Sequence, residues 1–322
     1  MSCGVDSSDF RPPGSAPLDP EQGGCALDYI GHIFRPPSEA ESLLLQVTVG
    51  CSHNDCTYCG MYRLPEQRFR LKPLDVITRD VEEAAAFSRD ITPIRRVFLC
   101  DGDALVLPTN RLLEILALIR TQLPHVRRVG IYGDARTIAR KDDLELAALR
   151  EAGLGIVYHG AESGDDEVLR RIRKGSNAED AVAAAGKLRR AGIRHSVMVM
   201  LGIGGNERSA EHAAATARLL TAMDPPFVGA LTTTLVPGTP LADEADAGRF
   251  TLPDPWGLLA ELRVLVADSR FTRCRFHSNH ASNYVPLSLN LPTDRDGAVR
   301  TLDGLLGERD RARLRPEHRR GL

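Results

Sequence analysis

Several features that would place this chain in a familiar class are missing from its sequence. No uninterrupted apolar stretch approaches the roughly 20 residues that a membrane-spanning helix requires. The formal net charge is -2, so no overall basic field indicates a nucleic-acid or membrane partner. The N-terminus carries neither a basic segment nor an apolar one, so we expect no secretory signal and a cytoplasmic location.

A disulfide framework is also missing. The chain has seven cysteines, an odd number, in 322 residues, which suits a reducing compartment and a metal role. Cys3, Cys25, Cys100 and Cys274 stand apart from the others in the sequence. Cys100 and Cys274 belong to predicted strands, and we expect both to be small buried hydrophobic residues. The alternative for Cys100 is a position facing the active site.

The three remaining cysteines, Cys51, Cys56 and Cys59, lie close together in one loop. They follow an apolar, β-branched run at 43–49 that ends in a glycine, a pattern typical of a strand that delivers a polar loop. Three thiolates can hold a metal centre and leave one position open, as reactive centres do. The alternatives are buried thiols or a structural zinc site with His53 as fourth ligand, although the sequence offers no second half-site for zinc.

Strands and helices alternate along most of the chain, which predicts a parallel sheet with helical crossovers. The glycine-rich and polar segments follow the strands, where barrel folds place their active sites. We therefore predict an α/β fold, a partial (βα)6–7 barrel of the TIM type. Strands are expected at 43–49, 96–100, 126–132, 155–159, 194–201, 227–236 and 273–277, and helices at 73–89, 109–123, 142–152, 165–173, 178–191, 207–223 and 256–269.

Three regions are expected along the chain. Residues 1–41 are rich in proline, glycine and serine and predict an irregular lead-in. Residues 42–285 show no repeat and no break in composition, which indicates one barrel domain. Residues 286–322 form a C-terminal extension whose basic tail, 311–320, we expect to be solvated.

The cysteine loop after a first strand, followed by six strand–helix units, resembles the radical S-adenosylmethionine (SAM) superfamily, and in particular its coproporphyrinogen-oxidase-like and Elp3-like members. The resemblance covers residues 42–285. It implies that Cys51, Cys56 and Cys59 bind a 4Fe–4S cluster, whose fourth iron is chelated by the amino and carboxylate groups of SAM. The common family spacing is Cys-x3-Cys-x2-Cys, and this loop is one residue longer between its first two cysteines.

The resemblance also implies SAM-binding positions after the later strands. Asp101 or Asp103 would accept hydrogen bonds from the amino group of SAM, and Lys174 would meet its carboxylate. The alternatives are that the aspartates cap a turn and that Lys174 stabilises a helix end. The motif at 236–241 recurs in the same family members. The implied SAM-binding residues are Tyr58, Asp101, Gly102, Asp103, Glu162, Ser163, Lys174, Gly202, Ile203 and Gly204.

Substrate-binding candidates follow two further strands. Tyr132 and Arg136 face either substrate or SAM, or else Arg136 forms an ordinary salt bridge at a strand end. The segment 278–284 is polar throughout, which indicates either a substrate-contacting wall or a turn held by side chain–backbone hydrogen bonds. Its candidates are Asn279, His280, Asn283 and Tyr284, with His280 and Tyr284 as the catalytic candidates.

The function that the resemblance implies is reductive cleavage of SAM to a 5′-deoxyadenosyl radical, which acts on a small-molecule substrate. Such an oxygen-sensitive enzyme takes its electron from an external donor such as flavodoxin or ferredoxin. The sequence lacks a later cysteine cluster, a cobalamin motif and an appended basic domain, which disfavours an auxiliary cluster, cobalamin chemistry and a nucleic-acid substrate. The alternatives are an aminocarboxypropyl transferase and a zinc or iron–sulfur protein without catalysis.

Overall fold

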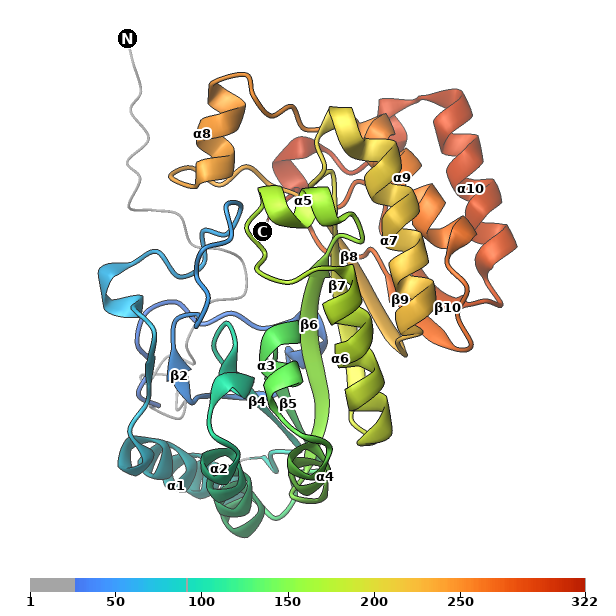
Figure 1. Cartoon of the computed structure of the whole chain (residues 1–322). Helices are drawn as coiled ribbons and strands as arrows, with labels where there is room; N and C mark the ends of the chain where they lie inside the picture. Colours follow the sequence, from blue (N-terminus) through green and yellow to red (C-terminus); the bar gives the residue numbers. More distant parts are fainter. Residues whose placement is uncertain (1–26, 91, 322) are drawn as a thin grey trace.

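The centre of the molecule is a sheet with strand order β1-β4-β5-β6-β7-β8-β9-β10. The computed structural model describes residues 27–90 and 92–321, so Cys3, Cys25 and most of the expected lead-in lie outside the described residues (Figure 1). Neighbouring strands are parallel except β9 and β10. The strands are β1 (Leu43–Gln46), β4 (Arg96–Cys100), β5 (Arg128–Tyr132), β6 (Leu154–Glu162), β7 (Arg194–Leu201), β8 (Phe227–Thr232), β9 (Cys274–His277) and β10 (Ser288–Leu291).

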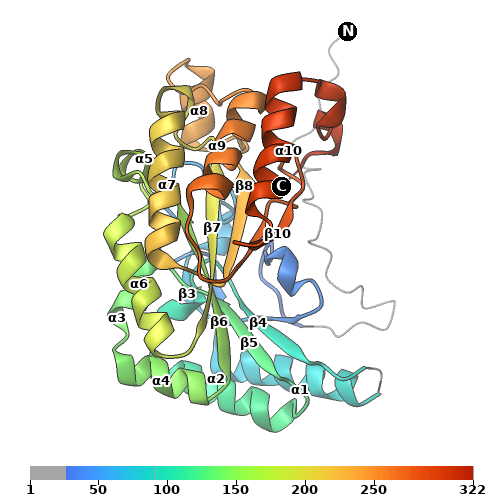
Figure 2. The ribbon, with the colours of Figure 1, turned by 90° about the vertical axis from the view of Figure 1, so that its right-hand side faces the viewer.

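Helices cover the outer face of this sheet. In the order α1, α2, α4, α6, α7, α9 and α10, each contacts the next, so together they form a continuous outer layer (Figures 1 and 2). None in the described ranges combines the length and apolar character needed to cross a bilayer. The helices are α1 (Leu74–Asp90), α2 (Thr109–Gln122), α3 (Ala135–Arg140), α4 (Asp143–Glu151), α5 (Asp166–Arg171), α6 (Ala178–Arg190), α7 (Ser209–Met223), α8 (Pro240–Asp246), α9 (Pro255–Asp268) and α10 (Arg295–Glu308).

The strand sequences divide their side chains between an outer face, buried under the helices, and an inner face, which is buried in β4 and only partly buried in β7 and β8. In β7, Val197 and Val199 pack among the helices, whereas Met198 joins the inner cluster. The inner face is filled by aromatic rings; Phe98 lies 4.9 Å from Tyr132 and 5.6 Å from Tyr158 between ring centroids. This inner cluster sits below the loops that carry the predicted site.

The segment that precedes β1 runs along that edge strand and covers it. The Gln46 side chain exchanges two hydrogen bonds with the Ile30 backbone, at 2.9 and 3.1 Å, and the Tyr29 hydroxyl donates to Leu44 O at 2.7 Å. A covered edge cannot pair with another chain. A separate hairpin, β2 (Thr48–Val49) antiparallel to β3 (Arg70–Leu71), brackets the cysteine loop.

The prediction of a partial α/β barrel is confirmed, but some elements were not expected. A short helix, α3, follows β5, and another, α8, follows β8. The extension contains β10 and α10, and β10 pairs with β9 in the same sheet. The division into three regions stays a prediction.

The basic tail at 311–320 is mostly exposed, as expected, but its arginines anchor it to the rest of the protein. Arg315 donates to His280 O at 2.7 Å and to Asn283 O at 3.0 Å, and Arg320 donates to Ser282 O at 2.9 Å. The tail therefore packs on the loop after β9, because its arginines satisfy carbonyl groups that no strand or helix partner reaches.

Candidate functional site

The hairpin of β2 and β3 positions the three cysteines. Gly50 directly follows β2 with a φ of +76°, and a Cβ there would lie 2.1 Å from Gln67 O, so only glycine fits this position. The loop that follows carries Cys51, Cys56 and Cys59 as free, half-buried thiols at the carboxyl edge of the sheet.

The longer gap between Cys51 and Cys56 contains a residue in the left-handed region and a histidine with two partners outside the loop. Asn54 adopts a left-handed conformation with φ +45°, which asparagine tolerates better than most residues. The His53 ring lies 2.9 Å from Arg136 and 2.7 Å from Arg173 O. Because the guanidinium of Arg136 can only donate, Nδ1 of His53 accepts and Nε2 donates to the Arg173 carbonyl. The longer loop is thus fixed to the elements that follow β5 and β6.

The thiols lie in a desolvated setting. Burial raises the pKa of Cys56 to about 12, although the nearby Lys174 ammonium opposes the rise. Burial also raises the pKa of Cys51 and of Cys59. Within the described ranges, no three His, Cys, Asp or Glu side chains converge as ligands of a single metal ion do. A cluster offers each thiolate a separate iron, so its ligands have no need to meet at one point.

The turn after β4 lies directly against the first cysteine. A Cβ on Gly102 would lie 2.7 Å from Cys51 Cβ, so a glycine is needed for this approach. Asp103 is fully engaged: it accepts from Ser52 Oγ at 2.7 Å, from Thr137 Oγ1 at 2.8 Å and from a backbone amide. It makes no capping bond to the following turn. Asp103 therefore ties the cysteine loop to α3.

Asp101 is buried but only half satisfied. Its Oδ2 accepts from Gln46 Nε2 at 2.9 Å and from Gly50 N at 3.0 Å, whereas Oδ1 has no hydrogen-bond partner. Burial, opposed by those two hydrogen bonds, raises the pKa of Asp101 to about 7. A buried oxygen without a partner is costly, and a donor from a bound molecule would satisfy it. Of the two aspartates, Asp101 is the one with an acceptor to spare.

Beside the cysteines, Lys174 joins the buried carboxylate of Glu162 and the half-buried carboxylate of Asp134. Its Nζ lies 3.3 Å from Glu162 Oε1 and 3.6 Å from Asp134 Oδ2. Burial lowers the pKa of Lys174, but the negative charges of Glu162 and Asp134 have the larger effect, so the pKa of Lys174 is raised. Glu162 stands at a bulge in β6 with φ +63°, an uncommon conformation for this residue. Glu162 and Lys174, which the resemblance assigned separately to SAM binding, thus form an ion pair, and the Lys174 ammonium has carboxylate partners although its backbone follows the end of α5.

Two more of the predicted SAM-binding residues take part in a buried network. Ser163 Oγ lies 2.8 Å from His212 Nδ1 and accepts from Asp165 N at 2.9 Å. Gly202 N donates to Glu261 Oε2 at 2.6 Å, and Glu261 lies 3.7 Å from His212 Nε2. The network ties the loops after β6 and β7 to each other.

The other predicted SAM-binding residues line the same edge. Ile203 is buried in a cluster that Tyr58 packs against, and Gly204 lies over His212. Burial and the neighbouring Glu162 raise the pKa of Tyr58. Their roles toward SAM stay predictions.

The substrate candidates fall into two groups. Tyr132 packs in the inner aromatic cluster, and Arg136 forms an ion pair of 2.8 Å with Asp134. In the second group, the Asn283 side chain bonds to Ala230 O and Thr232 Oγ1, and the Tyr284 hydroxyl donates to Glu317 in the tail.

These contacts give Asn283 and Tyr284 structural partners. His280 is half-buried with its Nδ1 2.9 Å from Ser282 Oγ, whereas Asn279 is exposed. Their catalytic and substrate roles stay predictions.

Sequence reasoning missed three residues that shape the site. Asp134 follows β5 and holds Lys174, and its place at a strand end was the available signal. Gln46 faces inward from β1 and holds Asp101. Glu261 is an acid within the apolar stripe of α9, and a buried acid in such a stripe needs a partner.

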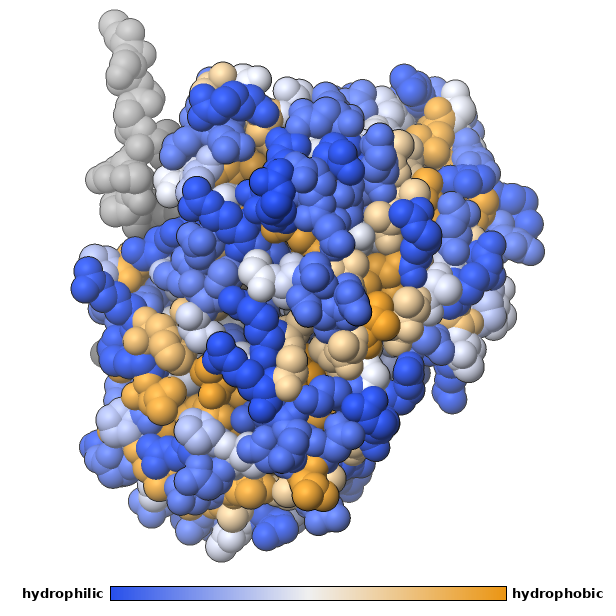
Figure 3. All heavy atoms as spheres, viewed as in Figure 1, coloured by the Kyte–Doolittle hydropathy of each residue, from blue (hydrophilic) through white to orange (hydrophobic). Residues whose placement is uncertain are grey.

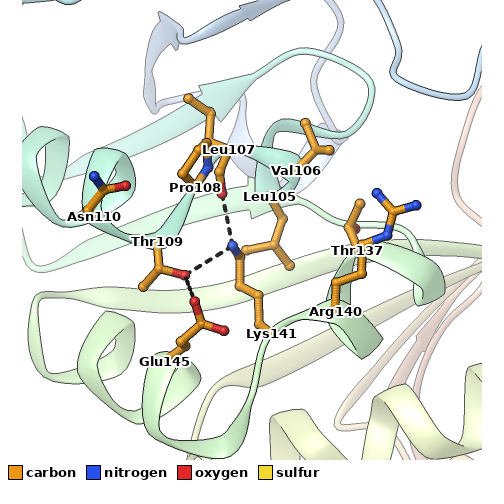
Figure 4. A pocket seen from close by; sticks show the side chains of 10 residues that line it. All are labelled: Leu105, Val106, Leu107, Pro108, Thr109, Asn110, Thr137, Arg140, Lys141 and Glu145. Carbon is orange, nitrogen blue, oxygen red and sulfur yellow. Dashed lines mark hydrogen bonds between the residues drawn. The ribbon is translucent and has the colours of Figure 1, made fainter.

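A surface pocket of about 430 Å³ opens between residues 105–110 and residues 137–145, and none of the three cysteines lines it (Figure 4). Buried Lys141 donates to Leu107 O at 2.8 Å and to Thr109 Oγ1 at 3.2 Å. These bonds fix the start of α2. The pocket is lined by Leu105, Val106, Leu107, Pro108, Thr109, Asn110, Thr137, Arg140, Lys141 and Glu145.

The residues present fit a cluster with SAM. The three cysteines are free thiols on one loop, as cluster ligands must be. Asp101 Oδ1 is a buried acceptor that lacks a donor, which suits an ammonium group. Lys174 supplies a cation beside Cys56 for a carboxylate.

Comparison with known proteins agrees with this chemistry. The model of the radical SAM superfamily matches residues 45–217, more than half of the chain. A biotin synthase from Dechloromonas aromatica (strain RCB) is 27% identical over 257 residues, which cover 75% of this chain and 74% of that protein.

Two solved structures share the fold. Methylornithine synthase superimposes with a TM-score of 0.51 at 19% identity, over 70% of this chain and 61% of its own. Coproporphyrinogen III oxidase from Escherichia coli has a TM-score of 0.51 at 16% identity, over 69% of this chain and 50% of its own. The chain thus spans about half to three fifths of these two proteins. From its sequence, its fold and its cysteine loop, the protein belongs to the radical SAM superfamily of enzymes, whose cofactors are a 4Fe–4S cluster and SAM.

Proposed function

We propose that this enzyme cleaves SAM reductively and directs the resulting 5′-deoxyadenosyl radical to a small-molecule substrate on the inner face of the sheet. One observation carries the proposal: free Cys51, Cys56 and Cys59 lie beside the buried Glu162–Lys174 pair. Next to an open cluster position, the Lys174 cation suits the carboxylate of the methionine part of SAM, and the Asp101 carboxylate, on the turn that approaches Cys51, suits its ammonium group. Biotin synthesis is not part of the proposal, because 27% identity does not carry a substrate across.

In this proposal each residue has a separate task. Cys51, Cys56 and Cys59 hold the cluster, Lys174 meets the SAM carboxylate and Asp101 Oδ1 accepts from its amino group. The bound cofactors supply the electron transfer and the radical. The chain itself orients SAM and excludes water, since Asp101, Glu162 and Lys174 are all buried.

The test is product analysis after anaerobic reconstitution. Wild type with SAM and dithionite should yield 5′-deoxyadenosine, whereas Cys56→Ala should yield none. If wild type leaves SAM intact, the protein is a cluster or zinc protein without this catalysis, and the proposal fails. If it releases 5′-methylthioadenosine instead, the sulfonium is cleaved on its other side and the enzyme transfers an aminocarboxypropyl group.

A further inference from the structure

The segment after the third cysteine exposes an unusual concentration of apolar side chains. Five large apolar residues are exposed in the described part of the chain, and four of them lie between residues 61 and 71. The four are Met61 (37% exposed), Leu64 (37%), Phe69 (41%) and Leu71 (45%). Figure 3 shows apolar surface over the hairpin of β2 and β3, with hydrophilic surface around it. We call residues 61–71 the hairpin patch.

The hairpin patch is also basic. Arg63, Arg68 and Arg70 are exposed, and no ion pair formed within residues 27–90 and 92–321 includes them. Glu66 is the acidic residue of the segment. The whole chain has a net charge of -2, so this positive surface departs from the average of the molecule. Exposed apolar groups rimmed by polar and charged side chains mark an interaction surface, and here three of the four charged side chains are positive.

The hairpin patch touches the backbone of the cysteine loop directly. Arg63 donates from Nε to Cys59 O at 2.9 Å and from a terminal nitrogen to Cys56 O at 3.0 Å. β3 pairs with β2, the strand that leads into Cys51. A partner seated here would therefore rest against the protein wall that holds the cluster ligands.

We propose that the hairpin patch is the docking surface for an acidic electron-donor protein, which carries a reduced flavin or iron–sulfur centre. This proposal rests on the proposed function. Carboxylates on the donor would meet the unpaired arginines, and its apolar surface would cover the four exposed side chains. In each encounter the donor loses one electron and the enzyme gains it, with no proton or group transferred.

The test compares Arg68→Glu/Arg70→Glu with Arg218→Glu, which reverses the charge of an exposed arginine on α7. Neither Arg68 nor Arg70 touches the cysteine loop in the hydrogen bonds above. Titration of the reconstituted enzyme with purified flavodoxin, and separately with an acidic ferredoxin, should give a dissociation constant about tenfold weaker for the double variant in low salt. The control should bind like wild type, and high salt should remove the difference.

Turnover gives the second readout. With reduced flavodoxin, SAM consumption by the double variant should fall about tenfold in kcat/KM, whereas the dithionite-driven rate stays within about twofold of wild type. Phe69→Ser should weaken binding of the donor in the same way. Leu144→Ser should not, because Leu144, the remaining exposed apolar residue of the five, lies on α4 outside the hairpin patch.

Three results would overturn the docking proposal: no binding of either donor to wild type, equal binding by the double variant, or an equal loss of the dithionite-driven rate. A change from dimer to monomer in the double variant, with donor binding intact, would assign the patch to a second copy instead. If the proposed function fails, wild type leaves SAM intact in the presence of dithionite. The binding titration still shows in that case whether the donor docks on the hairpin patch.

Discussion

The variant Lys174→Met removes the ammonium group that lies between buried Glu162 and half-buried Asp134. Its Nζ lies 3.3 Å from Glu162 Oε1 and 3.6 Å from Asp134 Oδ2. At an effective dielectric constant of about 20, each pair gains roughly 5 kcal/mol of Coulomb attraction, much of which offsets the desolvation of the charges. Asp134 keeps its ion pair with Arg136 at 2.8 Å, so the loss falls on Glu162. We expect the free energy of unfolding to fall by about 3 kcal/mol.

A second substitution tests the cause of that loss. Glu162→Gln in the Lys174→Met background removes the uncompensated charge and should restore about 2 kcal/mol. Urea unfolding of the cluster-free protein with added reductant, arranged as a double-mutant cycle, measures the coupling. Lys141→Met is the matched control, because Lys141 is buried with backbone and hydroxyl partners instead of an ion pair, and Glu162→Gln should not restore its stability.

The reasoning is refuted if Lys174→Met lowers the free energy of unfolding by less than about 1 kcal/mol, or if Glu162→Gln restores nothing. Equilibrium dialysis of SAM against the reconstituted double variant then separates the two roles of Lys174. If the double variant recovers both SAM binding and stability, the role of Lys174 is to neutralise Glu162, and it has no contact with SAM. Recovery of stability without SAM binding would support its contact with the SAM carboxylate.

Three further changes probe other parts of the structure. Gly102→Ala should reduce the iron bound after reconstitution by about half or more, because the added Cβ would crowd Cys51. The control Gly304→Ala should leave the iron content unchanged, because a Cβ there meets nothing within 4 Å. Equal iron content in the two variants would contradict the close approach of Gly102 to Cys51. Burial raises the pKa of Glu261 from 4.5 to about 7, so wild-type stability falls as pH rises through that window. In urea unfolding, the free energy of unfolding of Glu261→Gln should therefore rise relative to that of wild type by up to about 3 kcal/mol between pH 5 and pH 8. If the difference between the two proteins does not change with pH, the pKa of Glu261 is not raised. Arg320→Ala should lower the free energy of unfolding by about 1–2 kcal/mol, because its guanidinium lies 3.8 Å over a tyrosine ring; an unchanged melting temperature would mean that the tail is free in solution.

The fold was largely readable from local pattern, because apolar runs and helical stripes are short-range signals. The misses were short or late elements. α8 begins with Pro240 after the N-cap Thr239, a recognisable start that the surrounding glycine and proline obscured. α10 carries a buried stripe of Ala298, Leu302 and Leu305, whose spacing predicts a helix once it is sought.

The candidate site was predictable only in part. The cysteine loop is a local motif, so its position follows from the sequence. The contacts that hold it do not, because Ser52 and Asp103 are 51 residues apart and His53 and Arg136 are 83 apart. Residue type alone could not distinguish Asp101, with its free acceptor, from the fully bonded Asp103.

The longer cysteine loop has a consequence for how such enzymes are recognised and how they diverge. The longer gap is accommodated here because Asn54 adopts a left-handed conformation and His53 contacts Arg136 in α3 and the backbone of Arg173. Evolution can thus vary the gap between the first two cysteines wherever a turn former and an external anchor arise together. Genome searches that demand a fixed cysteine spacing would pass over enzymes of this design, whereas searches that allow the gap to vary would find them.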